Sequence, residues 1–179
     1  SGPAGGAPRQ PGSQDAATAS VSTLTMRQLP RDPATMVEMR AIIALLQQAG
    51  EVPTELRNRA LTAHFDDATL RTVRDALLVE LQTHGSTELS ERVAATVPEP
   101  FRGLVRELAI TPMEEGPRGI AASVRGYVAN LVHRDILREK SELLGQAMRL
   151  APRDPEGARE IHRRIGELDI ERERLEEQR

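Results

Sequence analysis

The sequence contains no cysteine and no tryptophan, and its aromatic side chains are limited to one tyrosine and two phenylalanines. Without cysteine the chain can form neither a disulfide nor a thiolate metal site, and it has no thiol nucleophile. The scarcity of aromatic residues disfavours a β-sandwich, because strands draw on aromatic and β-branched side chains. The core is therefore expected to consist of Leu, Ile, Val, Ala and Met.

Long apolar runs and a strong overall charge are also missing. No run approaches the roughly 20 apolar residues of a membrane-spanning helix, and the first residues lack the apolar core of a signal peptide. The formal net charge is −3 over 179 residues, which gives no bulk attraction for nucleic acid. We therefore expect a cytoplasmic protein with no membrane partner and no direct nucleic-acid contact.

Motifs that carry catalysis are absent from the sequence. The four histidines are scattered without the spacing of a metal site. The acidic pairs at 66–67 and 114–115 stand at helix-start and loop positions, where capping and solvation explain them better than acid–base chemistry. No phosphate-binding, dinucleotide-binding or nucleophile-elbow motif occurs. The sequence predicts that this chain alone is not an enzyme and holds no cofactor or metal.

Helical periodicity begins after a segment of a different composition. Residues 1–30 are rich in Gly, Pro, Ala and Ser and have too few large apolar residues to offset the entropy of ordering, which predicts a disordered linker. Asp32 and Pro33 then form a helix start, and Gly50 a helix stop. Four more short helices are expected to start near residues 53, 67, 89 and 101, giving a helical bundle over residues 31–133.

The last third of the sequence predicts a helical hairpin. Pro117 is expected to start a long helix, and the sequence from Gly119 to Leu150 contains no proline. The segment A-P-R-D-P at 151–155 then stops this helix and starts another. The apolar residues of the final helix follow steps of three and four, which is the spacing of a narrow helix-pairing seam. We predict an all-α fold in which a multi-helix bundle is followed by a projecting hairpin over residues 134–179.

The hairpin is the candidate binding surface. Its charges are balanced, with 11 Lys/Arg and 12 Asp/Glu from residue 134 onward, so most of them are explained by a solvated face. Aliphatic residues beside the seam are harder to explain without a partner. The residues predicted to contact a partner are Ile136, Leu143, Leu144, Met148, Ile170, Arg172, Arg174 and Leu175.

In order and spacing, three segments resemble the C-terminal helicase-binding domain of bacterial DNA primase, the actinobacterial form in particular. They are RDPATMVEMRAIIALLQQAG at 31–50, LVRELAITPMEEGPRGIAASVRGYVANLV at 104–132, and the closing hairpin. The turn ELAITP, which leads into the long helix, is the most persuasive local match. The resemblance covers about residues 30–179.

This resemblance implies a bundle similar in fold to the N-terminal domain of the replicative helicase, and a hairpin that docks on the hexameric helicase. The domains that use zinc and magnesium and make RNA primers, as a DNA-directed RNA polymerase, would lie upstream of the linker. It further implies that the acidic tail of single-stranded-DNA-binding protein is a ligand. The candidate residues for that tail are Arg57, Arg59, Arg102 and Arg106.

Two other interpretations stay open at this point. The N-terminal domain of the replicative helicase itself would share the fold, but the Pro/Gly-rich segment before the bundle suits an interdomain linker of primase better. A structural protein that forms homodimers through a coiled coil is the alternative of another class. Its seam would be short and interrupted by Arg172, so we expect the isolated chain to be monomeric.

Overall fold

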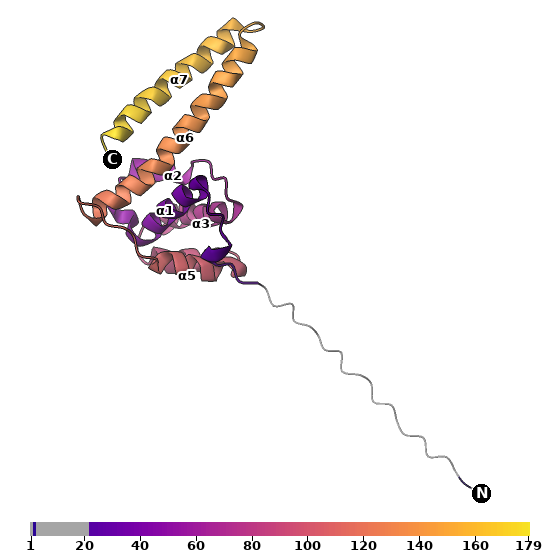
Figure 1. The fold of residues 1–179 in the computed structure, drawn as a ribbon, viewed down its shortest axis with the longest axis vertical. Coiled ribbons are helices and arrows are strands. Elements are labelled where there is room, and N and C mark those ends of the chain that lie inside the picture. Colours follow the sequence, from indigo (N-terminus) through magenta and orange to yellow (C-terminus); the bar gives the residue numbers. More distant parts are fainter. Residues whose placement is uncertain (1, 3–21) are drawn as a thin grey trace.

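A computed structural model describes Gly2 and residues 22–179 of the chain. Within this part there are seven α-helices and no β-strand, so the predicted all-α fold is confirmed. Five helices and the first half of the sixth form a bundle, from which a hairpin of the sixth and seventh helices projects (Figure 1). The helices are Pro33–Gln48 (α1), Thr54–Leu61 (α2), Ala68–His84 (α3), Leu89–Thr96 (α4), Arg102–Ile110 (α5), Ile120–Leu150 (α6) and Pro155–Glu176 (α7). None of them combines the length and apolar character needed to cross a membrane.

The centre of the bundle is α1. Its stretch from Ala41 to Leu46 consists of six apolar residues in succession, and a helix that is apolar on all sides has to be surrounded. All six side chains are at most 5 % exposed. Helices α3, α4, α5 and α6 all contact α1, so this run marks the element around which the other helices pack.

Local chemistry sets the helix starts. An aspartate side chain accepts a hydrogen bond from the backbone N–H three residues later at Asp32, Asp67 and Asp154. The long helix α6 begins at Ile120, three residues after the predicted start at Pro117. Gly119 immediately before it has a φ of 88°, a conformation that glycine adopts far more readily than other residues. The glycine, rather than the proline, therefore sets the start of α6.

The bundle begins before the predicted boundary at residue 30. A 3-10 helix, Met26–Gln28, is followed by Leu29, whose side chain lies in the hydrophobic core. The backbone N–H of Leu24 donates to the carbonyl of Pro100, at 2.9 Å. The prediction of a linker over the whole of residues 1–30 is therefore wrong for residues 22–30, and its remainder lies outside the described residues.

A close approach to α5 explains why this N-terminal segment packs. A Cβ atom at Gly103 would lie only 2.7 Å from Cγ2 of Thr23, so the absence of a side chain there makes room for the segment. The N–H of Met26 also donates to the carboxylate of Glu107 on α5, at 2.9 Å. These contacts join residues that are far apart in sequence, so the composition of residues 22–30 could not predict them.

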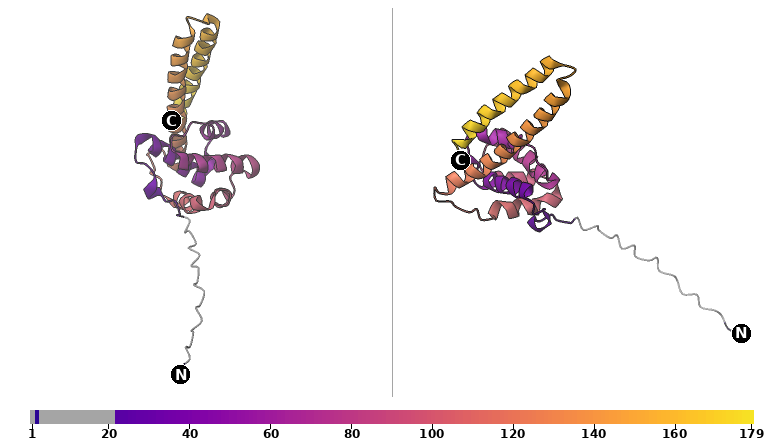
Figure 2. Two further views of the ribbon diagram at one scale, coloured as in Figure 1. Left: turned by 90° about the vertical axis from the view of Figure 1, so that its right-hand side faces the viewer. Right: turned by 45° about the horizontal axis from the view of Figure 1, so that its top comes forward.

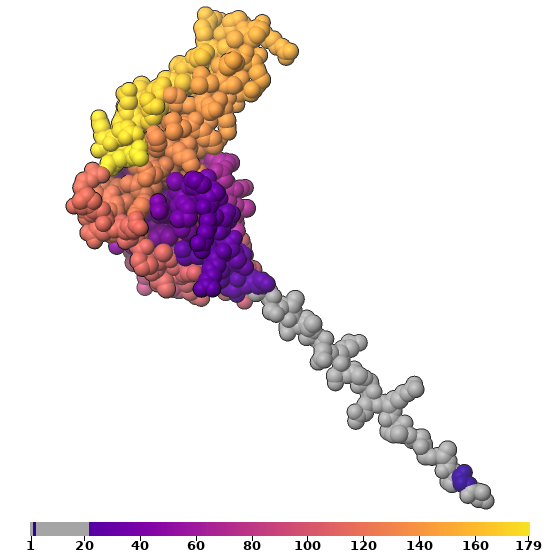
Figure 3. All heavy atoms as spheres, in the orientation of Figure 1, coloured from indigo at the N-terminus to yellow at the C-terminus, as the bar shows by residue number. Residues whose placement is uncertain are grey.

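Helices α6 and α7 form the projecting hairpin. Helix α6 is continuous over 31 residues, which corresponds to about 46 Å at 1.5 Å per residue. Its first half lies against the bundle, and its second half extends beyond it beside α7, as two further views show (Figure 2). In the space-filling view the distal half of the hairpin has no contact with the bundle surface (Figure 3). The predicted projection is therefore confirmed.

The seam between α6 and α7 follows the predicted spacing. Ala158, Ile165, Leu168 and Leu175 are buried, while Arg172 in the same row is partly exposed. Leu168 and Leu175 also belong to the hydrophobic core of the bundle. The C-terminal half of α7 is therefore anchored on the bundle, and only the distal half of the hairpin is free.

Candidate functional site

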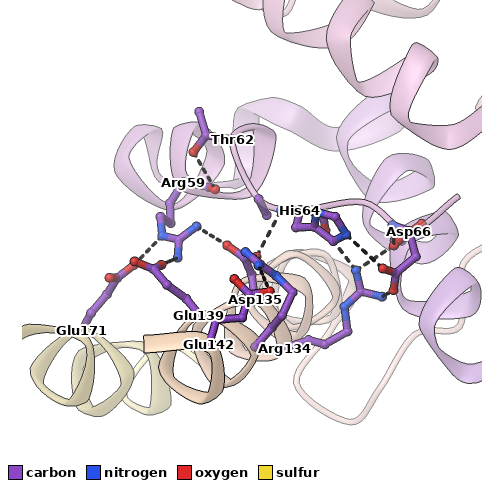
Figure 4. A network of polar contacts seen from close by, with 12 residues as sticks. Arg59, Thr62, His64, Asp66, Arg134, Asp135, Glu139, Glu142 and Glu171 are labelled. Carbon is purple, nitrogen blue, oxygen red and sulfur yellow. Dashed lines mark hydrogen bonds and ion pairs between the residues drawn. The ribbon is translucent and has the colours of Figure 1, made fainter. Parts of the chain in front are cut away.

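The junction between bundle and hairpin is a cluster of charged side chains centred on Arg59 of α2. Its guanidinium donates to Asp135 of α6 and to Glu171 of α7, at 2.7 Å each. Glu139 of α6 lies 3.6 Å away. Three helices therefore meet at one guanidinium, and both helices of the hairpin are among them (Figure 4).

Asp135 is the buried member of this cluster, with 4 % of the residue exposed. Burial by itself would raise the pKa of its carboxyl group. Hydrogen bonds from Arg59, from Arg138 and from the backbone N–H of His64 outweigh the burial, so the pKa of Asp135 lies below its ordinary value. The carboxylate is ionised at neutral pH and has four donors around its two oxygens, counting both Arg138 nitrogens.

A second buried carboxylate lies on α1, which also packs against α6. Glu38 of α1 is fully buried and accepts hydrogen bonds from the backbone N–H groups of Asp66 and Asp67, at 2.6 and 3.1 Å. Arg134 of α6 donates to the same carboxylate at 2.7 Å and to the carbonyl of Ala34 at 2.9 Å. Glu38 thus joins α1, the start of α3 and α6.

These contacts correct the predicted domain boundary at residue 134. Arg134 reaches α1, Asp135 reaches α2, and Ile136 is buried in the bundle core. The bundle therefore extends a full turn further along α6 than predicted. Because paired buried charges tolerate little displacement, the two clusters fix the direction in which the hairpin leaves the bundle.

The residues predicted to contact a partner separate into two groups. Ile136 and Leu175 are buried and Leu143 packs against the core, so these three are structural. Exposed side chains are found at Leu144, Met148, Ile170 and Arg174, with Arg172 partly exposed. Leu137, which was not among the predicted residues, is 44 % exposed and lies beside the buried Ile136. An adjacent apolar pair marks one inward and one outward residue, but the spacing did not show which was which.

Ile170 and Arg174 lie at a groove rather than on a convex surface. They line a groove of about 500 Å³ between α2 and α7, whose floor is formed by Leu56, Val132 and Leu175. The charged residues of the lining are three acids, Glu55, Glu167 and Glu171, and two arginines, Arg59 and Arg174. The groove has no dominant charge.

The four arginines predicted to bind an acidic tail do not converge. Arg57 and Arg59 are on α2 next to the hairpin, whereas Arg102 and Arg106 are on α5 at the other end of the bundle (Figure 1). Arg59 is committed to the junction cluster, and Arg57 donates to the carbonyl of Ala49 at 3.2 Å. The prediction of a common cradle for an acidic tail is therefore wrong.

A different surface combines arginines with apolar side chains. Two hollows of about 230 and 130 Å³ lie on either side of Met39 on α1. Four of the chain's five methionines line them, together with three arginines and one acid. These residues are Met26, Met36, Met39, Met113, Arg27, Arg31, Arg40 and Glu114; we call this surface the methionine groove. Methionine side chains adapt to differently shaped ligands, and the charge balance favours acidic ones.

Three of the four histidines lie close to carboxylates. His64 lies 3.0 Å from Asp66, and His84 lies 3.1 Å from Glu80. His133 is 3.6 Å from Glu176. Among the described residues there is no group of three or more His, Cys, Asp or Glu side chains arranged to hold a metal ion.

Comparison of the chain with protein-family models, with curated proteins and with solved structures finds no match.

Proposed function

We propose that this chain is the helicase-binding module of a DNA primase, which attaches primase to the replicative helicase through the hairpin. The observation that carries the proposal is the distal half of the hairpin, which extends beyond the bundle and exposes aliphatic side chains to solvent. Its junction with the bundle is held by buried ion pairs, so a bound partner would be kept in a defined direction. The order of the sequence segments that resemble primase supports the identity of the partner.

A shortened hairpin tests this proposal. Removal of residues 144–150 and 155–161 takes seven residues from each helix, which keeps the seam in register and leaves the junction cluster intact. We expect the shortened chain to keep the thermal transition of the bundle, measured by circular dichroism. Its affinity for the purified hexameric helicase, measured by calorimetric titration, should fall at least tenfold. Unchanged affinity in a folded shortened chain would exclude docking through the hairpin.

The acidic tail of single-stranded-DNA-binding protein is a second proposed ligand, and the methionine groove favours it. The groove offers apolar hollows next to Arg27, Arg31 and Arg40, which suits a peptide with both acidic and apolar residues. We expect Arg40→Glu to weaken binding of a fluorescently labelled tail peptide at least fivefold, measured by anisotropy. Arg102→Glu on α5 is the matched control. If the control variant weakens binding and Arg40→Glu does not, the groove is not the site.

A further inference from the structure

The outer face of α6 carries a stripe of exposed side chains that α7 does not cover. Residues 137, 141, 144 and 148 follow steps of four, three and four, so they share one face of the helix. Leu137 and Leu144 are each 44 % exposed and Met148 is 78 % exposed. Of the six large apolar residues that are exposed in the described part of the chain, three belong to this stripe. The eleven steps from 137 to 148 span about 16 Å, or three helical turns.

Small residues accompany this stripe. Ser141 lies between its two leucines, and Gly145 follows directly after Leu144. A glycine within a helix costs about 1 kcal/mol relative to alanine. A Cβ atom at Gly145 would come close only to the end of the Arg149 side chain, so packing within this chain does not explain the glycine. Where large apolar residues alternate with small ones on an exposed helix, another helix can approach closely and place its side chains between them.

Three arginines and one glutamate lie on one flank of the stripe, and two of these arginines are already paired with carboxylates. Arg134, Arg138 and Arg149 follow the same flank of α6, and Glu142 is the acid on that flank. Glu142 is already paired with Arg138, at 2.8 Å. Arg149 is exposed and has no carboxylate partner within the described part of the chain. The rim of the stripe is therefore cationic at the distal end of the hairpin.

We propose that this stripe receives an amphipathic helix of the partner, whose apolar face packs on Leu137, Leu144 and Met148 and whose flank carries acidic residues opposite Arg149. The inference rests on the proposed function and narrows it, because it selects the outer face of α6 over the groove that contains Ile170. The apolar stripe supplies the packing, and the cationic rim sets the orientation of the bound helix.

Single substitutions test the stripe without disturbing the seam. Purified hexameric replicative helicase is titrated with the complete chain and with Leu144→Asp, Met148→Asp and Arg149→Glu. We expect at least a tenfold loss of affinity for each aspartate variant and about a fivefold loss for Arg149→Glu at low salt. Val79→Asp places the same charge on an exposed aliphatic position of α3 and should bind within twofold of the wild type. Equal helicity of all variants, measured by circular dichroism, shows that the fold is retained.

The outcomes separate this inference from the proposed function. If the wild-type chain binds and Ile170→Asp alone weakens binding, the stripe is wrong and the function stands. If the wild-type chain does not bind the helicase, both fail. Sedimentation of the free chain tests whether a second copy of the chain binds the stripe instead. A dimer that is dissociated by Leu144→Asp would show that it does, and would contradict the proposal. An unchanged affinity of Arg149→Glu would remove the acidic flank from the proposal.

Discussion

The junction cluster leads to a quantitative prediction for Arg59→Met. Arg59 makes two hydrogen bonds of 2.7 Å to carboxylates, and bonds to charged groups contribute about 1.5–3 kcal/mol each. The bond to Asp135 counts nearly in full because that carboxylate is buried. The bond to Glu171, which is 32 % exposed, contributes at most about 1 kcal/mol.

Two features limit the loss. Asp135 keeps its hydrogen bonds from Arg138 and from the N–H of His64, so it is not left as an unpaired charge. The methionine side chain also preserves the apolar contacts of the arginine stem. We therefore expect Arg59→Met to lower the free energy of unfolding by about 2–3 kcal/mol, below the about 3–5 kcal/mol typical of a fully broken buried pair.

Urea unfolding followed by circular dichroism at 222 nm measures this change, since a chain with one tyrosine and no tryptophan gives little fluorescence signal. Arg163→Met is the matched control, because Arg163 also pairs with two glutamates but is 62 % exposed. It should leave the free energy of unfolding nearly unchanged, because exposed ion pairs contribute little to stability. In a double-mutant cycle with Asp135→Asn, the coupling energy should be about 1–2 kcal/mol. A loss below about 0.5 kcal/mol for Arg59→Met would refute the view that this cluster anchors the hairpin.

Three further predictions concern the same core. The pKa of Asp135 is lowered in the folded chain, so the ionised carboxylate stabilises the fold above its unfolded pKa of about 3.9, and this stabilisation is lost as the pH falls through the folded value. In urea unfolding at a series of pH values, the wild type should therefore lose more stability below pH 4 than Asp135→Asn. Parallel stability curves for the two proteins would contradict this. Glu38→Gln should cost about 2–4 kcal/mol in the same assay, because it leaves Arg134 without its buried partner, while the exposed Glu51→Gln should cost almost nothing. Leu29→Ala should cost about 2–3 kcal/mol if residues 22–30 pack as described, and a negligible loss would return the boundary to residue 30.

Much of the local structure was predictable from the sequence, because its causes are local. Asp32, Asp67 and Asp154 cap helices through bonds to residues three positions away, and these starts were readable from residue type and spacing. The periodicity of α7 predicted its seam, since an apolar residue every three or four positions has to face the same way.

The candidate site was less predictable. Of the two adjacent apolar pairs on α6, spacing could not tell which member points outward, and the structure shows Leu137 and Leu144 to be the exposed ones. The arginines proposed as a cradle share a residue type but lie on different helices, and one of them is committed to the junction. The methionine groove is formed by segments that are far apart in sequence, so no sequence motif could predict it.

The sequence by itself determined that this chain is helical, where most of its helices start, and that its last two form a hairpin. These properties depend on hydrogen bonds and side-chain periods within a few residues. Only the tertiary structure decided that residues 22–30 belong to the bundle, that Arg59 and Glu38 hold the hairpin in place, and which face of α6 is free. Each of these depends on the geometry between helices distant in sequence, where a single rotation of α6 about its axis would exchange buried and exposed residues.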